Sequence, residues 1–489
     1  MLFNSYEFIL GFLPITLAVF FLLGTLGHPR LALAWLTAAS LFFYGWWNAA
    51  HVFLICCSIL FNFGLGTALS ALMEQRRTQA GRALLLAGVG ANLSLIVYYK
   101  YAGFLVSSAG AAVGADWRID AILLPIGISF FTFQQIAYLV DIWHGDKAEH
   151  HFIRYALFIL FFPHLIAGPI VHPKVILPQL AASATLRPSL QNLAIGATIF
   201  AIGLFKKVII ADKLALVATP VFAAAQAGES IHFIQAWTGT LGYTFQLYFD
   251  FSGYSDMAIG LARLFGVRLA LNFHSPLRAL NIIDFWRRWH MTLSRFLRDY
   301  LYIALGGNRR GPARRYVNLM LTMLLGGLWH GANWTYVVWG GLHGIYLVVN
   351  HLWRAYGPAP IDRWWSRTTA RGVTLLAVAF AFVFFRAESF TAALAIFNGM
   401  INLPSTLPGR IGPLAPWLLS MGFRFDGPWL SSGDFKSLMW LAILVGFVWY
   451  VPNTQQWLAA FRPAYEPRSQ WPGESADNGR RARLARRVR

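Results

Sequence analysis

The segment Gly326-Gly327-Leu328-Trp329-His330-Gly331-Ala332-Asn333-Trp334 places a histidine between two apolar runs, one that begins near Val317 and one that ends near Val349. A titratable side chain at membrane depth is energetically costly and marks a functional site by default. The segment therefore predicts a membrane fold and a functional position at His330.

The composition supports a membrane protein, because 57% of the 489 residues are hydrophobic and only 12% are charged. Stretches of about 20 apolar residues are long enough to cross a bilayer. We predict an all-α, polytopic membrane helical bundle of about eleven transmembrane helices, with additional re-entrant and amphipathic helices. The candidate spans are Phe8–Leu26, Leu31–Trp47, Val52–Leu72, Ala83–Val106, Ile122–Val140, Phe152–Ile170, Leu193–Phe205, Trp237–Leu261, Val317–Trp329, Thr335–Val349, Val373–Phe385 and Leu438–Val451.

The net charge of +20 does not indicate nucleic-acid binding, because Lys and Arg gather in loops between apolar spans and in the tail. The positive-inside rule places these loops in the cytoplasm, and the loop around Asp116 and Asp120 outside. We expect an outer N-terminus, a transmembrane domain over residues 1–461 and a basic, disordered cytoplasmic tail over 462–489 that contacts membrane lipid. Asp250 and Asp256, late in one span, are expected to pair with arginines of the following loop.

An amphipathic helix is predicted over Asp284–Tyr300, with Asp284 as its N-cap. Its polar face carries Arg287, Arg288 and Arg295. These arginines fit lipid head groups or the phosphates of a cytosolic acyl carrier such as a coenzyme A thioester. His290 lies at the edge of the apolar face, where it either hydrogen-bonds a neighbouring helix or has a functional role.

A helix from Val317 to Trp329 rises about 20 Å, which is too short for a full crossing, and glycines loosen the backbone around His330. His330 should therefore lie in a cavity, where imidazole can act as a general base for acyl transfer to a hydroxyl. Asn333, Trp334 and His290 are candidate hydrogen-bond donors or orienting groups. The alternative is a buried histidine packed between tryptophans. No metal-ligand spacing is present, so no metal site and no bound cofactor are predicted.

The chain resembles the membrane-bound O-acyltransferase family, and within it the alginate O-acetylase branch. The motifs that carry the resemblance are Tyr138–Trp143, Phe161–Ile170, Asp250–Gly260, Phe285–His290, Tyr302–Arg309, Leu328–Gly331 and Pro452–Gln456. The resemblance implies that His330 is the catalytic histidine, that His290 is a second functional histidine, and that the helices surround a central funnel. Ala304 departs from the family pattern, in which a proline is expected.

The resemblance further implies transfer of acetyl groups from a cytosolic donor, acetyl-CoA, across a bacterial inner membrane for O-acetylation of an exopolysaccharide. Alginate is the first expectation, with cellulose and peptidoglycan as alternatives. It also implies a periplasmic serine-esterase-like acetyltransferase partner and a polysaccharide synthesis and export complex. A transporter or flippase without acyl chemistry is the alternative from another functional class, and it would not require His330.

Overall fold

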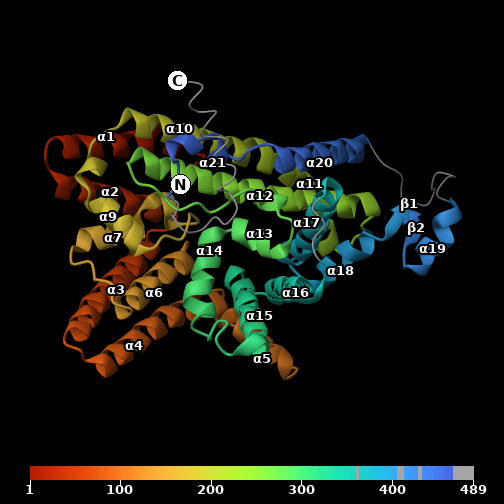
Figure 1. The fold of residues 1–489 in the computed structure, drawn as a ribbon, viewed down its shortest axis with the longest axis horizontal. Coiled ribbons are helices and arrows are strands. Elements are labelled where there is room, and N and C mark those ends of the chain that lie inside the picture. Colours follow the sequence, from red (N-terminus) through yellow and green to blue (C-terminus); the bar gives the residue numbers. More distant parts are fainter. Residues whose placement is uncertain (359–362, 405–411, 428–431, 466–489) are drawn as a thin grey trace.

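Most of the residues that the structure describes lie in helices (Figure 1). The computed structural model describes residues 1–358, 363–404, 412–427 and 432–465. Within these residues the only strands are β1 (Asn402–Pro404) and β2 (Arg424–Gly427), which pair in parallel. The predicted all-α fold is confirmed. Most of the predicted disordered tail, from residue 466 onward, lies outside the described residues.

The element bounds follow in chain order, where η marks a π- or 3₁₀-helical segment. The first part contains η1 (Glu7–Phe12), α1 (Leu13–Thr25), α2 (Pro29–Gly45), α3 (Ala50–Glu74), α4 (Thr78–Ile96), η2 (Val97–Tyr101), α5 (Ala102–Ala112), α6 (Ile128–Trp143), α7 (Phe152–Leu160), α8 (Phe162–Leu165), α9 (Pro173–Ala181), η3 (Ser183–Leu186), α10 (Leu190–Phe205), η4 (Lys206–Ala211) and α11 (Asp212–Gln226). The second part contains α12 (Phe233–Leu264), η5 (Pro276–Arg278), α13 (Ile282–Arg288), α14 (Met291–Phe296), η6 (Leu297–Tyr302), α15 (Gly311–His330), α16 (Trp334–Tyr356), α17 (Trp364–Arg386), α18 (Phe390–Gly399), η7 (Gly412–Leu414), α19 (Ala415–Ser420), α20 (Ser432–Tyr450), α21 (Thr454–Trp457) and η8 (Ala459–Phe461).

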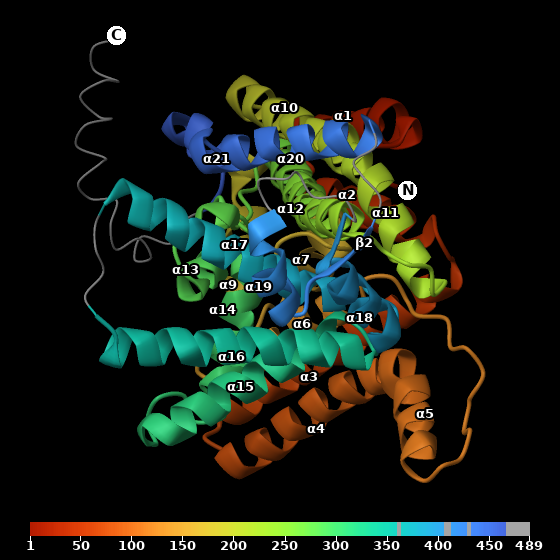
Figure 2. The ribbon, with the colours of Figure 1, turned by 90° about the vertical axis from the view of Figure 1, so that its right-hand side faces the viewer.

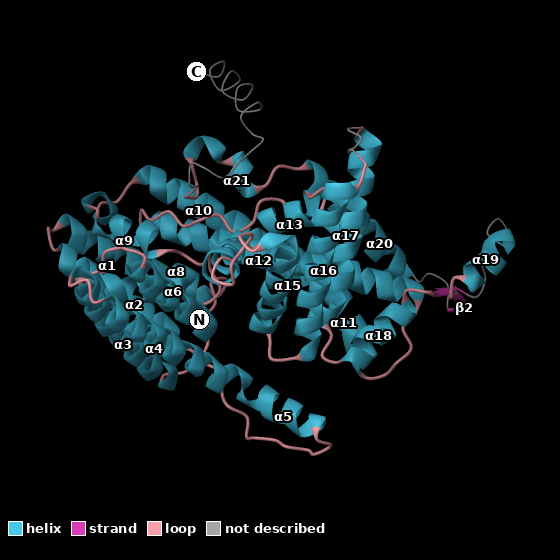
Figure 3. Ribbon diagram, turned by 60° about the horizontal axis from the view of Figure 1, so that its bottom comes forward, coloured by secondary structure: helices cyan, strands magenta, loops and turns pink. Residues whose placement is uncertain are grey.

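Five of the described helices are long and apolar enough to cross a membrane. They span Glu7–Thr25, Ala50–Glu74, Thr78–Ala112, Leu190–Gln226 and Trp364–Arg386. At most 39% of the apolar window of any of them is buried inside the protein. Their remaining apolar surface therefore faces outward, as it does in helices surrounded by lipid. The third of these helices ends in α5, which projects from the body of the protein (Figure 3).

The 32-residue helix α12 runs beside α10 at the centre of the protein (Figure 1). Glycines on both helices allow this close approach. A Cβ atom on Gly260 would lie 2.6 Å from the carbonyl oxygen of Gly196, and one on Gly203 would lie 2.6 Å from that of Gly253. Small residues of this kind let helix backbones pack by van der Waals contact where water supplies no driving force.

Two expectations about spans and charges are wrong. The predicted span Phe152–Ile170 is instead two short helices, α7 and α8, because the chain bends at Phe161 just before Pro163. The predicted arginine partners of Asp250 and Asp256 are lysines of the π-helical turn η4. Lys206 Nζ lies 2.6 Å from Asp256 Oδ2, and Lys207 Nζ lies 2.7 Å from Asp250 Oδ1.

The predicted amphipathic helix Asp284–Tyr300 is broken, with α13 and α14 meeting at His290. The N-cap of α13 is Asn281 and not Asp284, since the Asn281 side chain accepts a hydrogen bond from the Asp284 backbone N–H. His290 has a φ of 41°, which a non-glycine residue rarely adopts. The Met291 N–H donates to the Asn272 carbonyl, so tertiary hydrogen bonds replace helical ones at this bend.

Helices α15 and α16 form an antiparallel pair that ends at His330 (Figure 2). A Cβ on Gly327 would overlap the Tyr336 carbonyl of α16, so glycine is needed at this contact. The predicted start at Val317 is too late, because α15 begins at Gly311 and its 20 residues rise about 30 Å. The helix is continuous through Gly327 and ends at His330, and the following Gly331 has extended backbone.

Candidate active site

His330 is the last residue of α15, and its imidazole is enclosed by aromatic rings. The ring centroids of Trp329, Trp339 and Phe385 lie 4.8 Å, 5.1 Å and 5.0 Å from that of His330. Among the residues that the structure describes, none forms a hydrogen bond with its ring nitrogens. Aromatic contacts therefore orient this ring while both nitrogens stay available to a ligand.

His290 comes from the bend between α13 and α14, and it is only 1% exposed. Its Nδ1 lies 3.0 Å from Asn272 Oδ1. The same oxygen accepts a hydrogen bond from the Thr292 backbone N–H, so it must be the acceptor and His290 Nδ1 must carry the proton. In the neutral ring Nε2 is therefore unprotonated, and its lone pair can accept a hydrogen bond.

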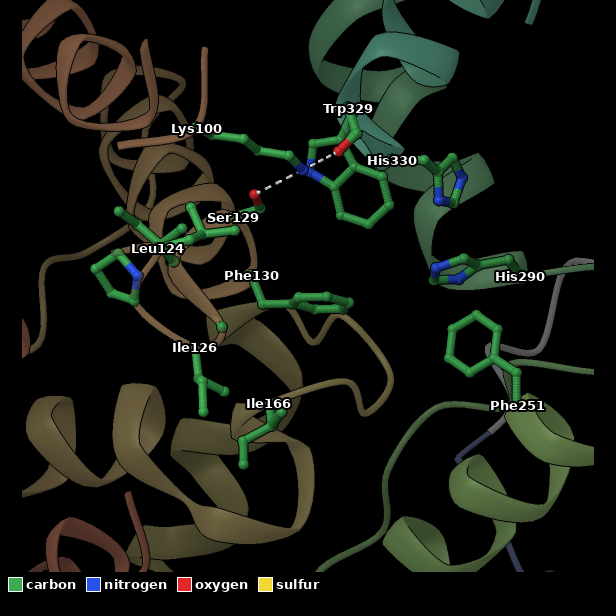
Figure 4. A pocket seen from close by; sticks show the side chains of 13 residues that line it. Lys100, Leu124, Ile126, Ser129, Phe130, Ile166, Phe251, His290, Trp329 and His330 are labelled. Carbon is green, nitrogen blue, oxygen red and sulfur yellow. Dashed lines mark hydrogen bonds between the residues drawn. The ribbon is translucent and has the colours of Figure 1, made fainter. Parts of the chain in front are cut away.

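Both histidines line one pocket of about 300 Å³ (Figure 4). The two imidazoles lie next to each other in the close-up, near the ring of Phe251, whose centroid is 4.8 Å from that of His290. The opposite side of the pocket is formed by Lys100, Ser129 and the loop Leu124–Gly127 before α6. Residues from α12, from the α13–α14 bend and from α15 thus meet at one cavity.

Asn333 and Trp334, predicted as donors near His330, do not line this pocket. Asn333 is the N-cap of α16, where its side chain accepts from the Thr335 N–H and donates to the Glu388 carbonyl. The Trp334 indole N–H donates to Ser108 Oγ at 3.2 Å. Their contacts hold the start of α16 against α5 and the end of α17.

The three predicted donor-binding arginines also lie outside the pocket lining. Arg287 is exposed on α13. The Arg288 guanidinium is 2.8 Å from Asp284 Oδ1 and also donates to the His274 carbonyl. Arg295 is half-buried on α14, the short helix that begins immediately after His290. Of the three, Arg288 is nearest to the pocket-lining His290 along the chain, but its guanidinium already has Asp284 as an ion-pair partner.

Sequence reasoning missed two residues of this site. Lys100 lies inside the predicted span Ala83–Val106, so the rule that singles out ionisable groups at membrane depth selects it as well as His330. Asn272 fixes the proton of His290, but it stands in the loop that follows α12, without a pattern that distinguishes it from other loop asparagines.

Residues 146–396, which include both histidines, match the model of the family described as MBOAT, membrane-bound O-acyltransferase. The chain belongs to the membrane-bound O-acyltransferase family. It is therefore an acyltransferase and a multi-pass membrane protein, as the motifs predicted.

Two kinds of named relatives are equally similar to this member of the family. It is 42% identical to the peptidoglycan O-acetyltransferase of Helicobacter pylori, over 82% of this chain and 80% of the relative. It is also 42% identical to the protein of Pseudomonas putida named "Probable alginate O-acetylase AlgI", with the same coverage of both chains. A teichoic acid D-alanyltransferase of Streptococcus thermophilus is more distant, at 29% identity over 48% of this chain.

Proposed function

We propose that this protein is a membrane-bound O-acetyltransferase that supplies acetyl groups for the O-acetylation of a polysaccharide outside the cytoplasm. The observation that carries the proposal is the pocket in which His330 and His290 lie next to each other. Both kinds of relatives that cover most of this chain are named for the O-acetylation of a polysaccharide, alginate or peptidoglycan, which supports the same activity here.

The chemistry proposed for the pocket uses the two histidines differently. A ring nitrogen of His330 takes the proton of an acceptor hydroxyl as its oxygen attacks the carbonyl carbon of the acetyl thioester. The new C–O bond forms, the C–S bond breaks, and the departing sulfur receives the proton from the His330 imidazolium. His290 Nε2, left unprotonated by the Nδ1–Asn272 hydrogen bond, accepts a hydrogen bond from a neighbouring hydroxyl of the acceptor and so positions the reacting one.

The donor in this proposal is acetyl-CoA, which enters from the cytoplasm as a substrate. The proposal includes no bound cofactor. Arg287, Arg288 and Arg295 are proposed to receive its phosphates, since guanidinium groups bind phosphate in bidentate fashion. The proposal also sets the protein in the bacterial inner membrane, with its C-terminus in the cytoplasm. Arg288 is already paired with Asp284, so Arg287 and Arg295 have the stronger claim to the phosphates.

The acceptor polymer is proposed to be alginate, with peptidoglycan as the competing candidate because the two sets of relatives are equally similar. Transfer to the polymer is proposed to involve a periplasmic serine-esterase-like acetyltransferase and a polysaccharide synthesis and export complex. Measuring acetyl esters separately on exopolysaccharide and on peptidoglycan, in cells with and without this protein, distinguishes the two polymers.

The test of the chemistry compares His330→Ala and His290→Ala with His144→Ala, an exposed histidine at the end of α6. Loss of a general base lowers the rate by about 100- to 10,000-fold, so polymer acetyl content should fall to background in His330→Ala cells. Size-exclusion chromatography of the detergent-solubilised proteins checks that each variant folds. Unchanged acetylation by folded His330→Ala protein contradicts the proposal and favours a transporter without acyl chemistry.

A further inference from the structure

Lys100 is a lone cation in the pocket. It lies in the π-helical turn η2 (Val97–Tyr101), inside the continuous apolar helix Thr78–Ala112. No carboxylate lines the pocket, and in the described parts of the chain none forms an ion pair with Lys100. An ammonium group in such a position is costly unless an anion compensates its charge, and ionisable groups inside membrane helices mark binding or transport sites.

The contacts of Lys100 leave one of its three ammonium hydrogens without a protein acceptor. Nζ donates to the Trp329 carbonyl and lies 3.5 Å from Ser129 Oγ (Figure 4). It is also 5.6 Å from the centroid of the Trp329 ring. These groups are neutral, so they hold the ammonium in place without neutralising it. The pocket thus offers a fixed positive charge with a free donor.

We propose that Lys100 binds a carboxylate on the acceptor while the acceptor hydroxyl lies at His330. The inference rests on the proposed function, because it assumes that acyl transfer takes place at His330. The Trp329 ring, 4.8 Å from the His330 ring between centroids, lies between Lys100 and His330 in the close-up. The acetyl group carries no charge, and it is too small to reach from His330 to Lys100. The anion must therefore belong to another part of the ligand, which indicates an acidic acceptor such as a uronic acid residue.

The position of the pocket wall agrees with an acceptor role. Leu124–Gly127 belongs to the loop between α5 and α6, which the charge pattern assigns to the outer face. Lys100 lies on the side of the pocket formed by this loop, whereas His290 is followed by α14 and its Arg295. A polymer arriving from outside would therefore meet Lys100, and a cytosolic donor would approach by way of the arginines.

Lys100 could instead serve only to cap the end of α15, and its neighbour Tyr101 makes it possible to test this structural role separately. The last carbonyls of a helix lack partners within the helix, and Lys100 satisfies that of Trp329. Tyr101 does the same for the preceding carbonyl, since its hydroxyl donates to Leu328 O at 2.9 Å. Tyr101 does not line the pocket. Tyr101→Phe therefore removes an equivalent cap without removing the charge.

The experiment uses the full-length protein in detergent and two acceptors, a short oligouronate and its carboxyl-reduced, neutral counterpart. Acetyl transfer from acetyl-CoA is measured for the parent protein, Lys100→Met, Lys100→Arg and Tyr101→Phe. Lys100→Met should raise the KM for the oligouronate at least about tenfold, the usual effect of losing a hydrogen bond to a charged group. Its kinetics with the neutral acceptor should not change, and Lys100→Arg should restore most of the preference.

A separate binding measurement distinguishes failure of this inference from failure of the proposed function. Oligouronate binding is measured by calorimetry in His330→Ala protein with and without Lys100→Met, which requires no transfer. Charge-dependent binding without transfer by the parent protein would support Lys100 and refute the proposed reaction. The inference is overturned if the oligouronate binds neither protein, if it binds both equally, or if Tyr101→Phe loses the same preference as Lys100→Met.

Discussion

Replacing Asn272 by alanine should impair catalysis beyond its effect on folding. The Asn272 side chain is fully buried, and its Oδ1 lies 3.0 Å from both His290 Nδ1 and Thr292 Oγ1. Asn272→Ala leaves these two donors without an acceptor, at a cost of about 1–3 kcal/mol each. It also releases the His290 proton from Nδ1. If the lost bond to His290 acts fully on the transition state, the rate falls roughly 5- to 150-fold.

The assay is acetyl transfer by purified protein, with thermal unfolding measured on the same samples. Asn318→Ala is the matched control, because Asn318 is also fully buried but its side chain donates to the Gly307 carbonyl away from the pocket. Asn272→Asp keeps an acceptor for His290 Nδ1, loses the donor to Ser255 Oγ, and adds a buried carboxylate whose desolvation lowers stability. It should therefore retain much more activity than Asn272→Ala at a similar loss of stability.

The reasoning about the His290 tautomer would be refuted if Asn272→Ala and Asn318→Ala lost the same stability and the same activity. It would also fail if Asn272→Asp were as inactive as Asn272→Ala, because the acceptor at His290 Nδ1 would then not explain the loss. A specific role of Asn272 requires that activity depend on the presence of an acceptor for His290 Nδ1, while the unfolding temperature does not depend on it.

Two further predictions concern helix packing and buried charge. Gly327→Ala should lower the unfolding temperature markedly, with a cost of about 1–3 kcal/mol or more, because its Cβ would overlap the Tyr336 carbonyl. Gly341→Ala, whose Cβ would have its nearest neighbour at 3.4 Å, should be tolerated in the same thermal assay. Asp256→Asn should destabilise by about 3–5 kcal/mol, since it leaves the Lys206 charge without its partner. An unfolding temperature equal to that of the parent would contradict this estimate.

The fold class and the position of His330 could be predicted because both depend on local patterns. Long apolar runs specify membrane helices, and a histidine between two of them at a glycine-rich end marks a functional position. The same rule applied to Lys100 would have identified the opposite side of the pocket. Lys100 was not predicted as part of the site, because a single sequence does not show which distant spans share a cavity.

The bend at His290 could not be predicted from helical periodicity. The pattern of apolar residues over Asp284–Tyr300 fits one helix, yet the backbone leaves the helical region at His290 with a φ of 41°. Hydrogen bonds to the segment Asn272–His274 compensate, since His274 N–H donates to the Arg288 carbonyl and Met291 N–H to that of Asn272. Long-range contacts of this kind override local propensity, and they are the reason that His290 lines the pocket.

The two histidines differ in a way that bears on which one carries the proton through the reaction. A group that accepts and returns a proton must be stable in both states, and a hydrogen bond that fixes one protonation pattern opposes such a cycle. His290 has its Nδ1 proton fixed by Asn272, which itself is held by Thr292. In the described part of the chain, aromatic rings alone contact the His330 imidazole, and they constrain its orientation without binding either nitrogen. His330 is therefore suited to exchange a proton with the substrates, and His290 to remain neutral and orient them.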